Sequence, residues 1–92
     1  MVTIWGRILG EGGDGVWNAT VVFRPSDPPG AYPKFTLSDG DGDFVIEGLK
    51  PGAYTVVVTQ RFYEVHTFAM QVTHDEYIEV ALARDLDHPH VY

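Results

Sequence analysis

Three aspartates alternate with glycine in the middle of the chain, at Asp39, Asp41 and Asp43. In calcium-binding loops, carboxylates at the first, third and fifth positions converge on the hard cation. Such loops also need a glycine at the sixth position and a glutamate at the twelfth, where this chain has Phe44 and Lys50. The spacing therefore favours a solvated acidic turn over a calcium site, and we predict no bound metal and no other cofactor.

A second group of metal-binding residue types lies near the C-terminal end and consists of Asp85, Asp87, His88 and His90. Imidazole and carboxylate groups are both competent metal ligands. Pro89 interrupts this short segment, however, and no strand pattern runs through it to hold the ligands in one geometry. We therefore predict no metal site here, and we interpret residues 85–92 as a tail after a domain of residues 1–84.

No nucleophile in the sequence has the surroundings of a catalytic one. Ser26 and Ser38 lie in a proline-rich loop and in a turn, without the glycine-flanked elbow that exposes the serine of a hydrolase. His66 shares a strand side with Phe68 and Met70, which is the pattern of a packed or interface histidine. The chain has no cysteine, so a thiol nucleophile and a zinc–thiolate site are excluded. We predict no catalytic residues and no enzyme activity.

A set of apolar side chains is expected to point away from the core: Trp5, Leu9, Trp17, Val22, Val45 and Val57. Outward aromatic and aliphatic side chains are typical of protein interfaces, and two tryptophans together can also form a flat platform for sugar rings. No spacing specific to carbohydrate recognition accompanies them. We therefore predict a protein interface, with Trp5 and Val22 on one face, and keep carbohydrate binding as the alternative.

The elements that position these residues are strands, because apolar residues recur at every second position and at no sustained helical spacing. Glycine-rich and proline-rich breaks divide the pattern into seven strands, over residues 2–9, 16–24, 35–37, 44–46, 53–60, 62–72 and 76–83. Short strands in this number are typical of an all-β antiparallel sandwich whose two sheets bury each other's inner faces. The side chains expected in that core include Phe23, Phe35, Phe44, Tyr54 and Ile78.

Two turns have clear sequence signals. Repeated Asp-Gly steps separate the strands that contain Phe35 and Phe44, which predicts a tight hairpin between those strands. A Pro-Gly step before the fifth strand predicts a second turn, since proline presets φ and glycine allows a positive φ. The residues to which we assign a structural role in these turns are Asp39, Gly42, Phe44, Pro51, Gly52 and Tyr54.

Composition limits the classes of partner. The chain has 92 residues, 45% of them hydrophobic, which is enough for one core and too much for a disordered chain. Lys and Arg number 6 and Asp and Glu 13, so the formal net charge is -7. This charge disfavours a nucleic-acid backbone or an anionic lipid surface, and no apolar run reaches the roughly 20 residues of a membrane span. We predict no nucleic acid and no membrane partner.

The segments SDGDGDF (38–44) and GLKPGAY (48–54) together resemble the signature of the carboxypeptidase regulatory-like family of transthyretin-like (prealbumin-like) β-sandwiches. The resemblance covers roughly residues 2–83. It implies a seven-stranded, antiparallel, Greek-key-like sandwich of transthyretin-like or Ig-like type that serves packing and partner contact. Some relatives cross-link a first-strand lysine, but Lys34 and Lys50 fall in loop or turn contexts, so we expect no such bond.

These observations lead to a prediction of function. We expect a non-catalytic module that docks on a larger protein assembly, and a bacteriophage capsid-decoration or tail-associated protein, located in the virion, fits best; a homo-oligomer is a further possible partner. The alternative is a carbohydrate-binding or surface-adhesion module cut from a longer exported protein. A location in the cytoplasm is expected of the chain as it stands, and an extracellular one if it is such an excised module.

Overall fold

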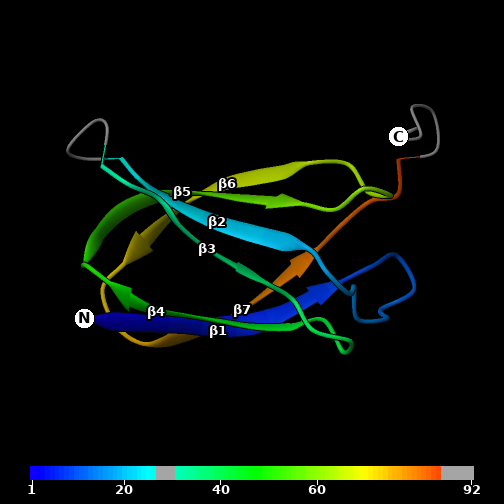
Figure 1. Ribbon diagram of the computed structural model, residues 1–92, viewed down its shortest axis with the longest axis horizontal. Coiled ribbons are helices and arrows are strands. Elements are labelled where there is room, and N and C mark those ends of the chain that lie inside the picture. Colours follow the sequence, from blue (N-terminus) through cyan, green and yellow to red (C-terminus); the bar gives the residue numbers. More distant parts are fainter. Residues whose placement is uncertain (27–30, 86–92) are drawn as a thin grey trace.

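The computed structural model describes residues 1–26 and 31–85, which form seven strands and no helix. The strands are β1 (Val2–Leu9), β2 (Thr20–Pro25), β3 (Lys34–Leu37), β4 (Asp43–Leu49), β5 (Gly52–Thr59), β6 (His66–Val72) and β7 (Glu76–Ala81). Sheet A has the order β4-β1-β7 and sheet B the order β3-β2-β5-β6, and they form the two layers of Figure 1. The predicted all-β sandwich is confirmed, and the described residues include no helix able to cross a membrane.

The core lies between the sheets because buried and exposed residues alternate along the strands. In β5 every second residue, beginning at Tyr54, is buried. The rings of Phe23 and Tyr54 meet edge to face with their centroids 5.9 Å apart, a favoured aromatic geometry. Each large apolar side chain that is fully buried contributes about 1.5–3 kcal/mol to folding. Phe23, Phe44 and Tyr54 are buried, whereas Ile78 is half-buried and packs against the core from its edge.

The turn that we predicted to be a hairpin is instead the connection between the two sheets. Its hydrogen bonds are those of a tight turn, since Gly42 N donates to Asp39 O (3.0 Å) and Asp39 N donates to Asp43 O (2.9 Å). However, β3 pairs with β2 in sheet B and β4 pairs with β1 in sheet A, so the hairpin prediction is wrong. Asp-Gly steps favour a tight turn without determining which strand the chain joins after it.

Phe35 lies outside the core, contrary to our prediction. It is aligned with Val22 on the outward side of sheet B and is 68% exposed. Thr36, the next residue, is aligned with the buried Val21 and occupies the inward position. The prediction failed because it placed Phe35 and Phe44 on one side of a hairpin, whereas their strands belong to different sheets.

One pair of strands is parallel, which corrects the prediction of a fully antiparallel sandwich. β1 and β7 run in the same direction, with Ile4 opposite Glu76 and Gly6 opposite Ile78. We had assumed that strands pair through hairpins, which makes them antiparallel, but β7 enters sheet A after the chain has left sheet B. Gly6 is needed in this pair because a Cβ atom there would overlap the carbonyl oxygen of Ile78.

Two strands begin later than we predicted: β2 begins at Thr20 and not at residue 16, and β6 begins at His66 and not at residue 62. Before β2, Asn18 has a φ of 62°, a left-handed conformation that ends an extended segment. Before β6, the chain makes a turn in which Tyr63 N donates to Gln60 O (3.0 Å). The predicted tail lies, apart from residue 85, outside the described residues, and the domain boundary stays a prediction.

Substituting Gly6 tests the parallel pairing. We expect Gly6→Ala to lower the free energy of unfolding by about 3 kcal/mol, because the new methyl group must displace the backbone of β7. Gly40→Ala is the matched control, since nothing lies within 4 Å of a Cβ atom there. Urea denaturation followed by circular dichroism measures both variants, and equal midpoints for the two would contradict the pairing.

Candidate docking surface

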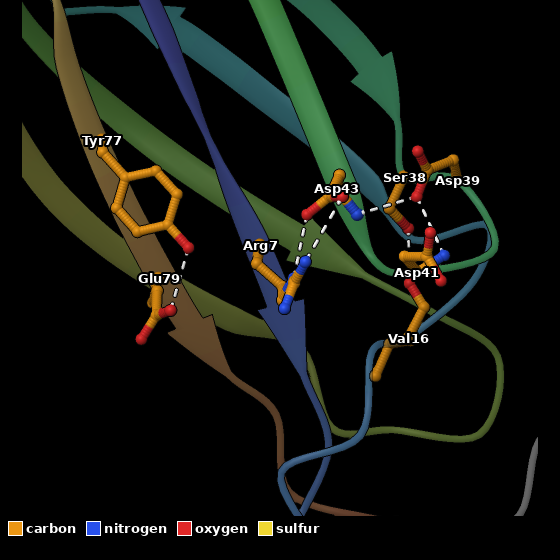
Figure 2. A network of polar contacts seen from close by, with 8 residues as sticks. All are labelled: Arg7, Val16, Ser38, Asp39, Asp41, Asp43, Tyr77 and Glu79. Carbon is orange, nitrogen blue, oxygen red and sulfur yellow. Dashed lines mark hydrogen bonds and ion pairs between the residues drawn. The ribbon is translucent and has the colours of Figure 1, made fainter.

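The corner between β3 and β4 holds the segment that precedes β2. Ser38, which is buried, accepts a hydrogen bond from Ala19 N at Oγ (2.8 Å) and donates one from Oγ to Val16 O (2.6 Å). Asn18 N also donates to Ser38 O (3.0 Å). Figure 2 shows the Ser38 hydroxyl directed at Val16. Because the backbone on both sides of Trp17 is fixed in this way, its indole is held outward and is 65% exposed.

Trp17 forms one wall of a shallow hollow of about 760 Å³ at the end of sheet B. Its floor includes Thr20 and Thr59, which are opposite each other in the outward row of β2 and β5. The facing wall comes from the loop between β5 and β6, where Phe62 and Val65 are exposed. In Figure 1 the loop after β1 and the loop after β5 lie at the same end of the sandwich. We call this depression the Trp17 hollow.

Gln60 braces the two walls of the Trp17 hollow. Its Nε2 donates to Trp17 O (3.2 Å), and its Oε1 accepts a hydrogen bond from Phe62 N (2.8 Å). Both ends of the side-chain amide are therefore engaged within the chain, which ties the Trp17 segment to the loop after β5.

An apolar row continues from the hollow across the outward side of sheet B. Phe35 is aligned with Val22, and Val22 with Val57, so the three lie side by side on neighbouring strands. Leu37, one outward position further along β3, is 51% exposed. We call this surface the B face and define it by Trp17, Val22, Phe35, Leu37, Val57, Phe62 and Val65.

The B face carries very little charge, although the chain as a whole has a net charge of -7. None of the four strands of sheet B contains an Asp or a Glu. Arg24 is the one ionised residue at the outward positions of these described strands. Arg61, in the loop after β5, also lines the Trp17 hollow, with its guanidinium carbon 5.1 Å from the centre of the Phe62 ring. Exposed aromatic residues with few charges and no carboxylates are typical of the centre of a protein interface, so this surface is suited to lose its water to a partner.

The outward side of sheet A has a shorter apolar row. Val45 is aligned with Trp5, and Trp5 with Tyr77, and the rings of Trp5 and Tyr77 meet edge to face at 6.4 Å. All three side chains are partly exposed, with Trp5 at 40%. This row is narrower than the B face, and the next row along the same strands is charged.

The charged row of sheet A satisfies its own groups. Arg7 Nε donates to Asp43 Oδ1 (2.9 Å), and the hydrogen bond and the charge of Asp43 raise the pKa of Arg7. The Tyr77 hydroxyl donates to Glu79 Oε2 (2.9 Å), and this hydrogen bond raises the pKa of Tyr77 above its ordinary value. Figure 2 shows Arg7 between the Tyr77–Glu79 pair and Asp43, with its side chain directed at Asp43.

The six predicted interface residues divide between the two opposite outer sides of the sandwich. Trp5, Leu9 and Val45 belong to sheet A, while Trp17, Val22 and Val57 belong to the B face. The prediction that Trp5 and Val22 share one face is therefore wrong, and Trp5 and Trp17 cannot form one platform. Alternation along a strand separates inward from outward positions, but it does not tell which sheet the strand enters.

The alternating aspartates form a compact acidic turn. Carboxylate oxygens of Asp39, Asp41 and Asp43 lie within 4.8 Å of one another. Asp39 Oδ1 accepts hydrogen bonds from Asp41 N and Asp43 N, each at 2.9 Å, and Asp43 is paired with Arg7. The three could offer oxygens to a cation, but the contacts present are those that close and orient the turn.

The other predicted turn residues lie beside the core. Phe44 and Tyr54 are buried, and the Tyr54 hydroxyl donates to Lys50 O (2.7 Å) across the turn that contains Pro51 and Gly52. Gly52 has a φ of 153°.

His88 and His90 lie outside the described residues. Sequence reasoning did not predict that four residues of the B face are exposed, namely Phe35, Leu37, Phe62 and Val65. Nothing in their local sequence pattern indicates this exposure.

Residues 3–83 match the family described as carboxypeptidase regulatory-like domain. The match covers most of the chain, so the chain belongs to the carboxypeptidase regulatory-like domain family. The resemblance inferred from the Ser38–Phe44 and Gly48–Tyr54 segments is confirmed. Among curated protein sequences, none matches the chain.

Several solved structures share the fold. Hydroxyquinol 1,2-dioxygenase from Pseudomonas putida has a TM-score of 0.74 at 12% identity, over 91% of this chain and 56% of the dioxygenase chain. A chain of the type II cohesin–X-dockerin complex from Acetivibrio cellulolyticus has a TM-score of 0.73 at 21% identity, over 89% of this chain and 57% of its own. A DUF3823 family protein from Bacteroides ovatus has a TM-score of 0.74 at 14% identity, over 89% of this chain and 45% of its own. This chain thus spans about half the length of these proteins, and the likeness concerns the fold.

The dioxygenases correct one prediction from the sequence. We inferred that the protein is not an enzyme, partly because the sandwich resembled accessory modules. Hydroxyquinol 1,2-dioxygenase and the 3-chlorocatechol 1,2-dioxygenase of Rhodococcus opacus have the same fold at 12% and 9% identity. The fold therefore occurs in enzymes, and the inference from fold to the absence of catalysis was wrong.

The Ser38 hydroxyl gives a test of how the hollow is positioned. We expect Ser38→Ala to lower the free energy of unfolding by about 1–3 kcal/mol, because Ala19 N–H would be buried without its acceptor. The fluorescence of Trp17 should also change as its segment loosens. Ser26→Ala, at an exposed position, is the control, and a loss of stability no larger than that of this control would contradict the assignment.

The hydrogen bond between Tyr77 and Glu79 predicts a pH effect. It favours the protonated phenol in the folded state, so its stabilising contribution is present below the ordinary tyrosine pKa and is lost as the pH rises through the raised pKa. We expect Glu79→Gln to move the pKa of Tyr77 back toward its ordinary value, whereas Glu47→Gln leaves it in place. Nuclear magnetic resonance titration of the Tyr77 ring measures both, and an unchanged pKa in Glu79→Gln would contradict the hydrogen bond.

Proposed function

We propose that this chain is a docking module that binds a protein partner through the B face. The observation that carries the proposal is the absence of carboxylates from all four strands of sheet B in a chain with a net charge of -7. Exposed Trp17, Phe35 and Phe62 then offer large side chains of the kind that contributes most at protein interfaces.

The proposed partner is a component of a larger protein assembly. The cohesin–X-dockerin neighbour belongs to a complex of proteins, which supports protein docking as a use of this fold. A phage capsid or tail, with the chain located in the virion, is the particular assembly expected from the sequence, and it stays a prediction that no comparison tests. The expected locations outside a virion are likewise untested.

Carbohydrate binding is the weaker interpretation. Its main support was a pair of tryptophans, but Trp5 lies on sheet A and Trp17 beside sheet B. The Trp17 hollow therefore offers one tryptophan ring and not the paired platform on which that interpretation depended. The B face therefore fits a protein surface better than a sugar.

Site-specific photo-crosslinking tests the proposal. A photoreactive phenylalanine analogue at position 35 should form an adduct with a partner in cells that naturally make this chain, and the same analogue at the exposed Tyr77, on the far edge strand of sheet A, should not. Val57→Asp, which places a charge in the apolar row without altering the core, should reduce the adduct about tenfold.

Thermal unfolding of Val57→Asp checks that the fold is retained. An adduct formed from position 77 and not from position 35 would overturn the proposal, as would an adduct from position 35 that Val57→Asp leaves undiminished. The mass of the adduct also shows whether the partner is a second copy of this chain.

A further inference from the structure

Four strands lie at the sheet edges, β3 and β6 in sheet B and β4 and β7 in sheet A. An edge strand exposes unpaired N–H and C=O groups and can accept another strand, so proteins protect edges with charges, proline or short length. Three of the four edges have such protection. β3 has 4 residues and begins with Lys34, while β4 contains Asp43 and Glu47, and β7 contains Glu76 and Glu79.

The β6 edge lacks this protection. The strand His66–Val72 (HTFAMQV) has 7 residues and contains no carboxylate, lysine, arginine, proline or glycine. Its pairing with β5 is regular from Val72 opposite Gly52 to His66 opposite Val58, with no bulge to twist the edge away. Within the described part of the chain, the other side of His66–Val72 has no strand partner, and the contact with the segment after β7 ends before it, where Tyr63 bridges Arg84 and Glu64 N donates to Ala83 O (2.7 Å). β6 is therefore an open template for strand addition.

A groove of about 440 Å³ runs beside this edge, between β6 and β7. Phe68 and Met70 line it from β6, and Ile78 and Val80 from β7. Phe68, Met70 and Ile78 are partly buried and pack against the core. Since side chains of a strand alternate in direction, a strand added to β6 would place every second side chain in this groove.

The charge around the groove selects the occupant. Glu76 and Glu79 line it together with the apolar residues. A second copy of this chain would bring the same carboxylates and another net charge of -7, which opposes self-pairing at the edge. Glu79 already accepts the Tyr77 hydroxyl, so Glu76, whose Oε1 lies 3.8 Å from His74 Nε2, is the carboxylate that a lysine or arginine at the end of an added segment would complement.

We propose that the β6 edge binds an extended segment of a partner protein as an added strand, with apolar side chains in the groove and a basic residue near Glu76. The inference rests on the proposed function in that the partner is a protein. The outward residues of β6, Thr67, Ala69 and Gln71, are uncharged and continue sheet B, so one partner can contact the B face and the edge together.

A synthetic peptide tests the edge directly. In the sequence Lys-Thr-Val-Thr-Val-Thr-Lys the valines and lysines share one side of a strand. We expect saturable binding to the complete chain, with amide shifts and slowed hydrogen exchange concentrated in β6. The same peptide with glutamate for lysine should bind about tenfold more weakly, and backbone N-methylation at alternate residues should abolish binding. No binding of the lysine peptide, or equal binding of the methylated one, would overturn the proposal.

Variants of the chain locate the interaction. Met70→Lys places a cation in the groove and should weaken peptide binding about tenfold. Because Met70 is half-buried and this variant can lose stability, Glu76→Gln provides a second test: it should reduce the preference for the lysine peptide over the glutamate peptide, while the control Glu47→Gln on β4 retains it. An unchanged preference in Glu76→Gln would overturn the charge argument.

Two further measurements are needed. The first distinguishes a partner segment from a second copy of this chain at the β6 edge, and the second distinguishes binding at the edge from docking through the B face. Sedimentation equilibrium should show a monomer, and a wild-type dimer that Met70→Lys dissociates would overturn the partner segment in favour of a second copy. Val22→Asp, which also places a charge in the apolar row of the B face, should leave peptide binding within about twofold, since Val22 is on β2 and β5 lies between β2 and the β6 edge. If the peptide does not bind but position 35 still forms its crosslink, only the proposal of strand addition at β6 is refuted. If the peptide binds but position 35 forms no crosslink, only the proposal of docking through the B face is refuted.

Discussion

The corner at Ser38 is the contact on which the rest of the structure depends, because there the chain passes from sheet B to sheet A. The Ser38 hydroxyl bonds the backbone of Val16 and Ala19, so the corner and the segment before β2 form one unit. Gly42 completes that unit, since its φ of 83° and the close approach of Gly15 leave no room for a side chain. The Ser38–Phe44 part of the family signature thus connects the two sheets, and its hydrogen bonds to the backbone of Val16 and Ala19 fix the position of Trp17.

Local patterns predicted the strands well and their neighbours poorly. The bounds of β1, Val2–Leu9, follow from alternation alone and agree with the structure. The same alternation could not show that β1 pairs with β7 in parallel, since that pairing depends on where the chain crosses between layers. Asp-Gly steps likewise identify a tight turn, but whether the turn makes a hairpin or a corner is decided by packing between residues far apart in sequence.

The candidate site shows the same limit. Trp17, Val22 and Val57 were predicted to face outward, and they lie on the B face, whereas Phe35 was placed in the core because its pattern equals that of a buried residue. Outward and inward positions on an edge strand look alike in sequence when both carry apolar side chains. The aligned position of Phe35 beside Val22 appears only once β3 is paired with β2.

The distribution of charge connects the fold to the proposed interaction. Within the described strands, every carboxylate lies in β4 or β7 of sheet A, and sheet B has none. Charges at the edges of sheet A deter strand addition there, while the same absence of charge that makes the B face apolar also leaves β6 open. Solubility alone does not explain why one sheet lacks charges, because charged side chains in place of Thr67, Ala69 or Gln71 would be exposed to solvent. The uncharged edge and the uncharged face are therefore best understood as two parts of one binding surface.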